Sequence, residues 1–180
     1  IIDSGKIERT WQDFASNHEL DLDDSEKNYG YAKKKSYTVI EKHGEHLIKY
    51  EYKFYPSAQT KVYPFDLIKN ANRFVISSAS EFFSDVDLKI SKSSWIRRLN
   101  YGDKFVVRSS RQIEFENVLK DKLSDTLKDF PDLTVEISPD VDSLAKQKNL
   151  TMLTHDLPGE LEEIESLREL FILIHGYFID

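Results

Sequence analysis

The sequence predicts an α+β fold in which a mainly antiparallel sheet packs against about three helices. The middle of the chain contains short segments with apolar residues at every second position. Apolar residues at helical spacing occur near the start, after residue 109 and at the end. Because helices and strands do not alternate through the middle, a doubly wound parallel sheet is disfavoured. A length of 180 residues fits one domain, so we expect a single globular unit over residues 1–180.

The first expected element is an amphipathic helix over about residues 5–18. Asp3 or Ser4 can cap its first turn. The apolar stripe of this helix, together with the half-buried histidine that we expect at its end, comprises Ile7, Trp11, Phe14, Ala15 and His18. The segment from Leu20 to Glu26 is acidic, and we interpret it as a linker that leads into the strands.

A block of strands follows the linker. A loosely alternating segment over 36–42 and a clearly alternating one over 48–54 are joined by a turn at Gly44. The second segment has an apolar side with Ile48, Tyr50, Tyr52 and Phe54, and a charged side with Lys49, Glu51 and Lys53. This pattern predicts a strand with one face buried and one face in water.

The later part of the block is less regular. Residues 62–68 are compatible with another strand or with a loop. Period-two alternation predicts a strand over 82–90, with Phe82 on its apolar side and Phe83 opposite. The other strands expected here are a short buried one over 74–76 and one that starts at Phe105 after a turn at 100–103.

The last third of the chain returns to helical spacing. Ser109 is a suitable N-cap for a helix of about five turns that Pro131 ends. Two short strands, over 133–137 and 150–153, come next. Pro158 suits the start of a final helix. The apolar stripe of that helix comprises Leu161, Ile164, Leu167, Phe171, Ile174 and Phe178.

Composition and charge exclude several classes of protein. A chain that is 39% hydrophobic and 32% charged is too apolar to be disordered and too polar to be a membrane bundle. It has no cysteine, which excludes disulfides and cysteine-based zinc sites. A formal charge of -7 disfavours nucleic acid as a partner. The longest apolar run, Leu170–Ile174, predicts no membrane span, which leaves a membrane surface or a protein as partner.

Basic residues concentrate between Lys92 and Arg111, where six bases face one acid, Asp103. Such a stretch is either a solvated face or a site for an anion or a lipid headgroup. Arginine beside an aromatic ring can hold a phosphate or a carboxylate. The candidate ligand-binding residues are Trp95, Arg97, Arg98, Arg108 and Arg111.

Motifs for catalysis or cofactor binding are absent from the sequence. It contains no Gly-x-Ser-x-Gly elbow, no Gly-x-Gly-x-x-Gly and no P-loop, so we predict no cofactor and no catalytic or metal-binding residue. His43, Glu45 and His46 surround Gly44, and we expect them to point outward from a turn with no further ligand nearby. We interpret His175 as a partly buried packing residue.

Two short patterns carry a resemblance to a family. The first comprises Trp11, Phe14, Ala15, His18 and Leu20, and the second comprises Gly102, Asp103, Phe105, Val107 and Ser109. In both, the chain resembles bacterial and archaeal domains of unknown function that follow one or two transmembrane helices. The resemblance implies a soluble domain tethered near a membrane, on its cytoplasmic side. The chain starts with Ile1, so we also expect a processed product or part of a longer protein, with an anchor or signal peptide upstream.

These observations favour a non-enzymatic binding or interaction domain, the soluble part of a membrane-anchored protein. The alternative is a hydrolase whose site is assembled from dispersed Asp, Glu and His residues. A structural or assembly module would instead show an exposed sheet edge or an apolar patch.

Overall fold

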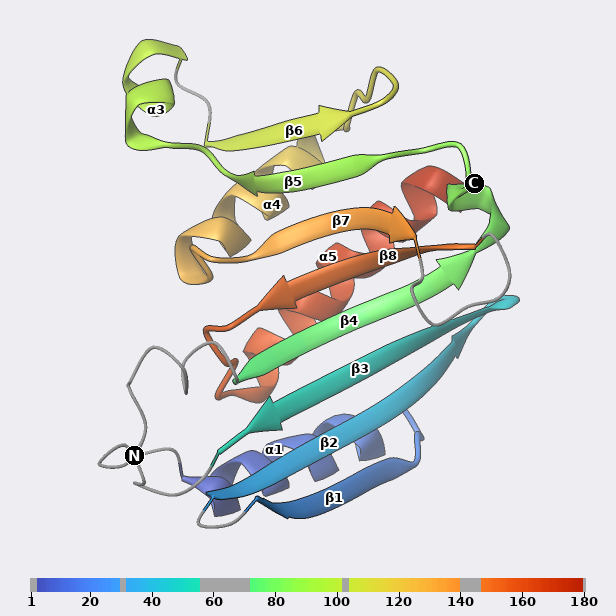
Figure 1. Ribbon diagram of the computed structural model, residues 1–180, viewed down its shortest axis with the longest axis vertical. Helices are drawn as coiled ribbons and strands as arrows, with labels where there is room; N and C mark the ends of the chain where they lie inside the picture. The colour runs from blue at the N-terminus through green and yellow to red at the C-terminus, as the bar shows by residue number, and fades with distance from the viewer. Residues whose placement is uncertain (1–2, 30–31, 56–71, 102–103, 140–146, 180) are drawn as a thin grey trace.

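The structure, a computed structural model, describes residues 3–29, 32–55, 72–101, 104–139 and 147–179 (Figure 1). Its centre is one eight-stranded sheet in the order β1-β2-β3-β4-β8-β7-β5-β6, in which every pair of neighbours is antiparallel. The strands are β1 (Leu22–Tyr29), β2 (Ala32–His43), β3 (His46–Phe54), β4 (Arg73–Ser80), β5 (Leu88–Lys92), β6 (Phe105–Ser109), β7 (Thr134–Pro139) and β8 (Lys148–Thr154).

Three long helices lie side by side on one face of this sheet (Figure 1). They are α1 (Ser4–Asn17), α4 (Asn117–Asp129) and α5 (Leu161–Ile179). A short helix, α3 (Trp95–Tyr101), connects β5 to β6, and a single turn of 3-10 helix, η2 (Glu81–Phe83), follows β4. The predicted α+β class, with an antiparallel sheet against about three helices, is therefore confirmed.

Helix α1 forms where the sequence predicts it. The Asp3 carboxylate accepts hydrogen bonds from the backbone N–H groups of Gly5 and Lys6, at 3.0 and 3.2 Å, and so caps the first turn. Trp11 and Phe14 are fully buried against the sheet. Trp11 stacks on Tyr37 of β2 with ring centroids 6.3 Å apart. These contacts make an aromatic cluster the core between α1 and strands β2 to β4.

Helix α5 covers the middle of the sheet with a fully apolar stripe, which contains Ile164, Leu167, Leu170, Phe171 and Ile174. Arg168 on this helix reaches Glu41 of β2 through two hydrogen bonds of 2.5 and 3.0 Å, and Tyr50 of β3 donates a third to the same carboxylate at 2.6 Å. His18, at the end of α1, pairs with Glu165 at 2.8 Å. Polar contacts thus fix both helices relative to the strands.

The acidic segment after α1 is a strand, and the expectation of a linker is wrong. Residues 22–29 form β1, which pairs with β2 along its whole length. Leu22 is its one large apolar side chain against the helical layer, while Asp24 and Glu26 are exposed. An edge strand can be this polar because hydrogen bonds to a single neighbour hold it, and charge protects such an edge from pairing with other chains.

The predicted strand over 82–90 is correct only in its last part. Phe82 N–H is bonded to the Ser80 hydroxyl at 3.2 Å, which starts the η2 turn, and β5 begins at Leu88. The turn reverses the expected sides, because Phe83 is buried and Phe82 is 62% exposed. A local side-chain cap therefore overrides the period-two pattern in this segment.

Two helix starts also differ from the prediction, and one helix lies where none was expected. Ser109 is the last residue of β6, and α4 starts eight residues later, at Asn117, because residues 110–116 cross from the sheet edge to the helical layer and bury Phe115. Helix α5 starts at Leu161, since the carbonyl of Pro158 instead accepts a hydrogen bond from Tyr52 at 3.2 Å. Helix α3 was not predicted as an element.

The remaining elements agree with the prediction. Strands β3, β4, β7 and β8 contain the expected buried residues, and β6 starts at Phe105 as expected. Gly44 turns the chain with φ of +61°, a conformation that favours glycine. The predicted strand or loop at 62–68 and the residues Gly102 and Asp103 lie outside the described residues. No helix in the described ranges is long and apolar enough to cross a bilayer.

Candidate functional site

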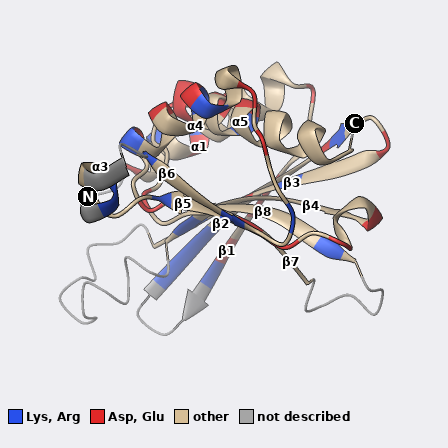
Figure 2. Cartoon of the chain, turned by 90° about the horizontal axis from the view of Figure 1, so that it is seen from above, with Lys and Arg blue, Asp and Glu red and all other residues tan. Residues whose placement is uncertain are grey.

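The two faces of the sheet differ in what covers them. Side chains such as Tyr37, Tyr52 and Ile76 point toward α1, α4 and α5 and are buried. Their neighbours along each strand point to the opposite side, which we call the open face. None of the helices in the described ranges lies over it, and in Figure 2 the three long helices are seen on one side of the strands only. The open face is thus an eight-strand surface that no helix of the described ranges covers.

The open face is basic although the chain as a whole is acidic. Strand alternation places on it the basic residues Lys27, Lys34, Lys42, Lys49, Lys53, Arg73, Lys89 and Arg108, and the acidic residues Asp23, Glu51 and Glu136. Blue segments accordingly mark the strands in Figure 2. Helix α5 on the covered side carries four glutamates and one arginine. Positive charge is therefore gathered on the uncovered side, against a formal net charge of -7.

Three cross-strand pairs on the open face join like charges. Lys27 is directly opposite Lys34, Lys53 is directly opposite Arg73, and Lys89 is directly opposite Arg108. Like charges in these positions destabilise a sheet. Lys89 is relieved by Glu136, whose carboxylate lies 2.7 Å from its ammonium, but neither Lys27 nor Lys34 pairs with an acidic residue of the described chain. An anion placed between the two lysines would remove this repulsion.

A shallow cavity of about 210 Å³ lies where β1, β2 and β3 meet on this side of the sheet. We call it the basic depression, and its lining residues are Ser25, Lys27, Lys34, Ser36, Glu51 and Lys53. The two serines face each other across β1 and β2, and Ser36 also faces Lys53 of β3. Three ammonium groups and two hydroxyls therefore surround one small space, a combination suited to an oxyanion.

Glu51 is the acidic member of the basic depression. Burial by itself raises the pKa of Glu51, but Lys49 at 2.6 Å and Lys53 at 3.3 Å outweigh it, so the pKa lies below the ordinary value. The carboxylate is therefore ionised at neutral pH and fixes the position of these two lysines. It neutralises part of the charge of β3 and leaves Lys27 and Lys34 as the uncompensated cations.

The structure does not bring the five residues predicted from the basic stretch into one site. Trp95, Arg97 and Arg98 lie on α3, at the start of β6, and Arg108 lies on the open face near the end of β6. Arg111 lies beyond that strand, with its guanidinium 5.4 Å from the centre of the Phe178 ring on α5. Of the five, only Arg108 shares the open face with the basic depression, and their function as ligand contacts stays a prediction.

The lysines of the depression were missed by sequence reasoning for a local reason. Lys27 and Lys34 follow the segment over 20–26 that is interpreted as a linker, so the sequence assigns neither of them to a face of a strand. The alternation of residues 48–54 correctly predicts that Lys53 points to solvent, but no neighbouring residue in the sequence marks a site. Only the pairing of β1 and β3 with the same strand, β2, brings Lys27 and Lys53 together.

Three histidines meet at the end of the β2–β3 hairpin. His43 and Glu45 are exposed as predicted for a turn. His175 of α5 packs beside this turn, with its ring 6.3 and 5.2 Å from the rings of His43 and His46. His175 is more buried than predicted, at 2% exposure, and packs against Phe171. In the described ranges, no three His, Asp or Glu side chains are close enough to hold a metal ion.

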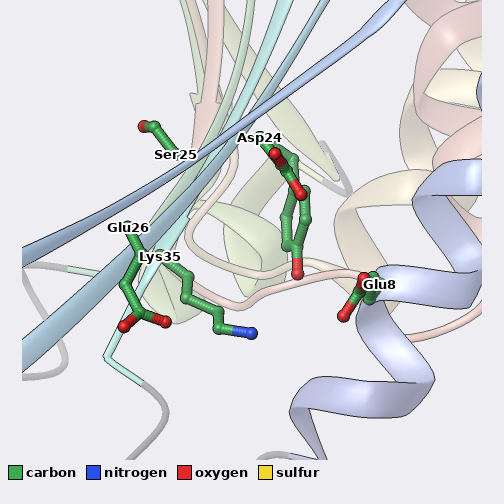
Figure 3. Close-up of a pocket in the computed structure, with 6 residues that line it drawn as sticks. Glu8, Asp24, Ser25, Glu26 and Lys35 are labelled. Carbon is green, nitrogen blue, oxygen red and sulfur yellow. The ribbon is translucent and has the colours of Figure 1, made fainter.

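A second cavity, of about 140 Å³, lies on the covered side of β1 and β2, next to α1. Figure 3 shows Glu8 of α1 across from Asp24 and Glu26 of β1, with Lys35 of β2 beside them. Burial, followed by the nearby carboxylates of Glu8, Asp24 and Glu26, raises the pKa of Tyr37 in this cavity to about 12. Tyr37 is therefore a neutral hydroxyl at physiological pH, and the ammonium of Lys35 offsets part of the acidic charge.

His155, which is adjacent to Asp156 in the sequence, has a structural role. Its backbone N–H and the Thr154 hydroxyl both donate to the Asp132 carboxylate, at 2.6 and 2.7 Å. Burial raises the pKa of Asp132, but these hydrogen bonds outweigh it and the pKa lies below the ordinary value. The imidazole Nδ1 lies 2.9 Å from the carbonyl of Asn72. The network joins the ends of β8, β7 and β4.

Comparisons with protein families, with curated proteins and with solved structures find no match for this chain. The resemblance to domains that follow transmembrane helices therefore stays a prediction.

Proposed function

We propose that this chain is a non-enzymatic binding domain that recognises a phosphate-type oxyanion through the basic depression of its open face. The observation that carries the proposal is the charge of that face, on which eight basic side chains outnumber three acidic ones in a chain of net charge -7. The directly opposed Lys27 and Lys34 supply two charges of this face that no acidic side chain among the described residues pairs with. Partial relief of their repulsion would add to the affinity for an anion.

Because the two sides of the molecule have opposite charges, the domain would bind an anionic partner in a preferred orientation. An anionic partner is repelled by α5 and attracted by the open face, so the domain approaches it with the sheet first. A membrane surface that contains anionic lipids is one partner of this kind, and each lysine near such a surface contributes about 1 kcal/mol. This fits the expectation of a soluble part of a membrane-anchored protein, because a tether would hold the open face near the headgroups.

The test compares charge reversal on the open face with the same reversal elsewhere. The variant Lys27→Glu/Lys34→Glu changes two cations of the depression and keeps a like-charge pair between the strands. Its matched control, Arg9→Glu/Lys120→Glu, makes the same change of net charge at exposed positions of α1 and α4. Co-sedimentation with phosphatidylserine-rich vesicles and calorimetry with inositol hexakisphosphate measure the two sources of phosphate.

We expect the open-face variant to lose affinity for at least one of these probes by about tenfold or more, and the control to lose much less. Binding to vesicles alone identifies a headgroup surface, and binding to both probes identifies the phosphate itself. Equal losses in the two variants, or no binding of either probe by the unmodified chain, would contradict the proposal. A single-stranded oligonucleotide serves as a third probe, and we expect no saturable binding to it.

The alternative function is a hydrolase with a site assembled from dispersed residues, and the cluster of His43, His46 and His175 favours it. Imidazoles can serve as general bases or as nucleophiles near neutral pH. The test is hydrolysis of p-nitrophenyl phosphate and p-nitrophenyl acetate by the unmodified chain and by His46→Ala. Turnover that disappears in the variant would support a hydrolase.

A further inference from the structure

Helix α3 presents an apolar ridge to solvent. Trp95 and Leu99 are 65% and 74% exposed, and they lie four residues apart, so their side chains share one side of the helix. Arg98 is also exposed and belongs to the same side, three residues after Trp95. We call Trp95, Arg98 and Leu99 the α3 ridge. Exposed tryptophan and arginine together are typical of residues that carry the binding energy of a protein interface.

An apolar groove lies between the start of α4 and the end of α5. Its volume is about 660 Å³, and we call it the α4–α5 groove; its lining comprises His43, Glu114, Glu116, Val118, Leu119, Ile172, Leu173, Gly176 and Tyr177. Val118 is 70% exposed, and Leu173 and Tyr177 are partly exposed, at 42% and 37%. Exposed apolar side chains in a concave setting mark a site that another apolar surface can fill.

The ridge and the groove complement each other in shape and in charge. The ridge is convex, with two large apolar side chains and a cation, whereas the groove is concave, with apolar walls and the carboxylates of Glu114 and Glu116 at its edge. Docking would bury Trp95 and Leu99 against Val118 and Leu173. It would also bring Arg98 toward the two glutamates, and complementary charges of this kind select the partner and its orientation.

The two surfaces cannot meet within one chain. Helix α3 forms part of the connection between β5 and β6, and the hydrogen bond from Ser93 N–H to the Lys104 carbonyl, at 3.2 Å, closes the base of that connection. The groove lies toward the other end of β6, near the start of α4 and the end of α5 (Figure 1). The five residues of β6 alone span about 14 Å. The ridge therefore remains available to a different molecule.

We propose that the α3 ridge of one copy of this chain docks into the α4–α5 groove of a second copy. Such a contact is heterologous, because it joins two different surfaces, and it leaves one free ridge and one free groove on every dimer. The contact would bury less area than a standard interface of about 800 Å² per partner, so the dissociation constant is expected in the micromolar range. The open face takes no part in it.

Sedimentation velocity over a concentration series tests association directly. We expect the average mass to rise above the 21.1 kDa of one chain, and to continue beyond a dimer as concentration increases. Tryptophan emission gives a second readout, because Trp11 is fully buried and Trp95 is one of only two tryptophans. Burial of Trp95 at the contact should shift the emission to shorter wavelength over the same concentration range.

Three variants locate the contact. Trp95→Ala removes the centre of the ridge, and Val118→Glu places a charge in the groove at an exposed position of α4. Leu47→Glu is the matched control, because it introduces the same charge at a 60% exposed apolar residue on the open face. We expect each of the first two to weaken association by tenfold or more and the control to leave it unchanged. Far-UV circular dichroism checks that all three fold.

A mixing experiment separates this contact from any symmetric one. Trp95→Ala keeps an intact groove and Val118→Glu keeps an intact ridge, so their mixture should form a 1:1 dimer that does not grow further. In addition, Arg98→Glu should weaken association, and Glu116→Arg in the partner should restore it. The proposal is overturned if the unmodified chain stays monomeric up to millimolar concentration, if the two variants associate as well as the control, or if their mixture forms no dimer.

Discussion

At the scale of single residues, the structure separates two buried tyrosines that look alike in the sequence. Tyr50 donates a hydrogen bond to Glu41, which also accepts from Arg168, so its hydroxyl belongs to a charged network. Tyr37 contacts rings on both sides, and its hydroxyl faces the small acidic cavity beside α1. The first tyrosine fixes α5 to the sheet, and the second supports the stacking between α1 and β2.

The Glu41 carboxylate gives a prediction about pH. Burial raises its pKa, but the hydrogen bonds from Arg168 and Tyr50 outweigh burial, so the pKa in the folded chain is lower than in the unfolded one. The resulting stabilisation is complete above the ordinary pKa of a glutamate, about 4.3, and is lost as the pH falls through the lower folded value. Glu41→Gln should therefore lower the free energy of unfolding at pH 7 by about 3 kcal/mol.

Urea denaturation of both proteins across the acid range measures this effect. The difference between them should shrink as the pH falls below about 4, because protonation then removes the charge from Glu41 in the unmodified chain as well. A difference that stays constant from neutral to acid pH would show that the pairing with Arg168 does not stabilise the ionised form.

At the scale of elements, the strands differ in their number of paired neighbours and in the buried apolar contact that they make. Strand β4 lies between β3 and β8 and contributes Phe74 and Ile76 to the core. Strand β1 has one neighbour, β2, and most of its side chains are charged or exposed. Because local opening follows the amount of buried apolar contact, the sheet should be least stable at its β1 edge.

Amide hydrogen exchange measured by mass spectrometry tests this order. Peptides from β1 should exchange faster than peptides from β4 by about tenfold or more, since fewer buried contacts must be broken to expose their N–H groups. Strand β8, in the centre of the sheet, provides the matched reference for slow exchange. Equal protection of β1 and β4 would mean that the edge strand is held by interactions beyond its pairing with β2.

At the scale of the whole molecule, one sheet joins the two halves of the chain. Strands β1 to β4 come from the first half, and β8, β7, β5 and β6 follow from the second, so the pairing of β4 with β8 is the seam. Helix α5 crosses this seam on the covered side and is tied to both α1 and β2. A single domain over residues 1–180 stays a prediction, which an unfolding experiment can test.

A single domain predicts one cooperative unfolding transition. In a Trp95→Ala background Trp11 is the sole tryptophan, so its emission reports on the first half. Far-UV circular dichroism reports on the whole chain, and the two curves should coincide. Phe171→Ala on α5 should shift both curves together, with a loss of about 3 to 5 kcal/mol, because the ring is fully buried. Two separate transitions, with only one of them sensitive to Phe171→Ala, would instead indicate two independently folding units.

Sequence alone was sufficient for the class of fold and for most of the core. The alternation of Ile48, Tyr50 and Tyr52 identified β3, and the helical spacing of Trp11 and Phe14 identified α1, because burial on one face imposes its period on the chain. The sequence was insufficient where a local hydrogen bond or a neighbouring element determines the structure. At Ser80, for example, a side-chain cap starts the η2 turn where a strand was expected.

The candidate sites depended on the tertiary structure almost entirely. Lys27, Lys34 and Lys53 form one depression only because β1 and β3 both pair with β2, and the register of those pairs is set by contacts across the sheet. Trp95 was recognised as notable from its arginine neighbours, but only the closed base of the β5–β6 connection shows that it is held away from the groove of its own chain. Periodicity records which side of an element is buried, whereas the meeting of distant surfaces is a property of the folded chain.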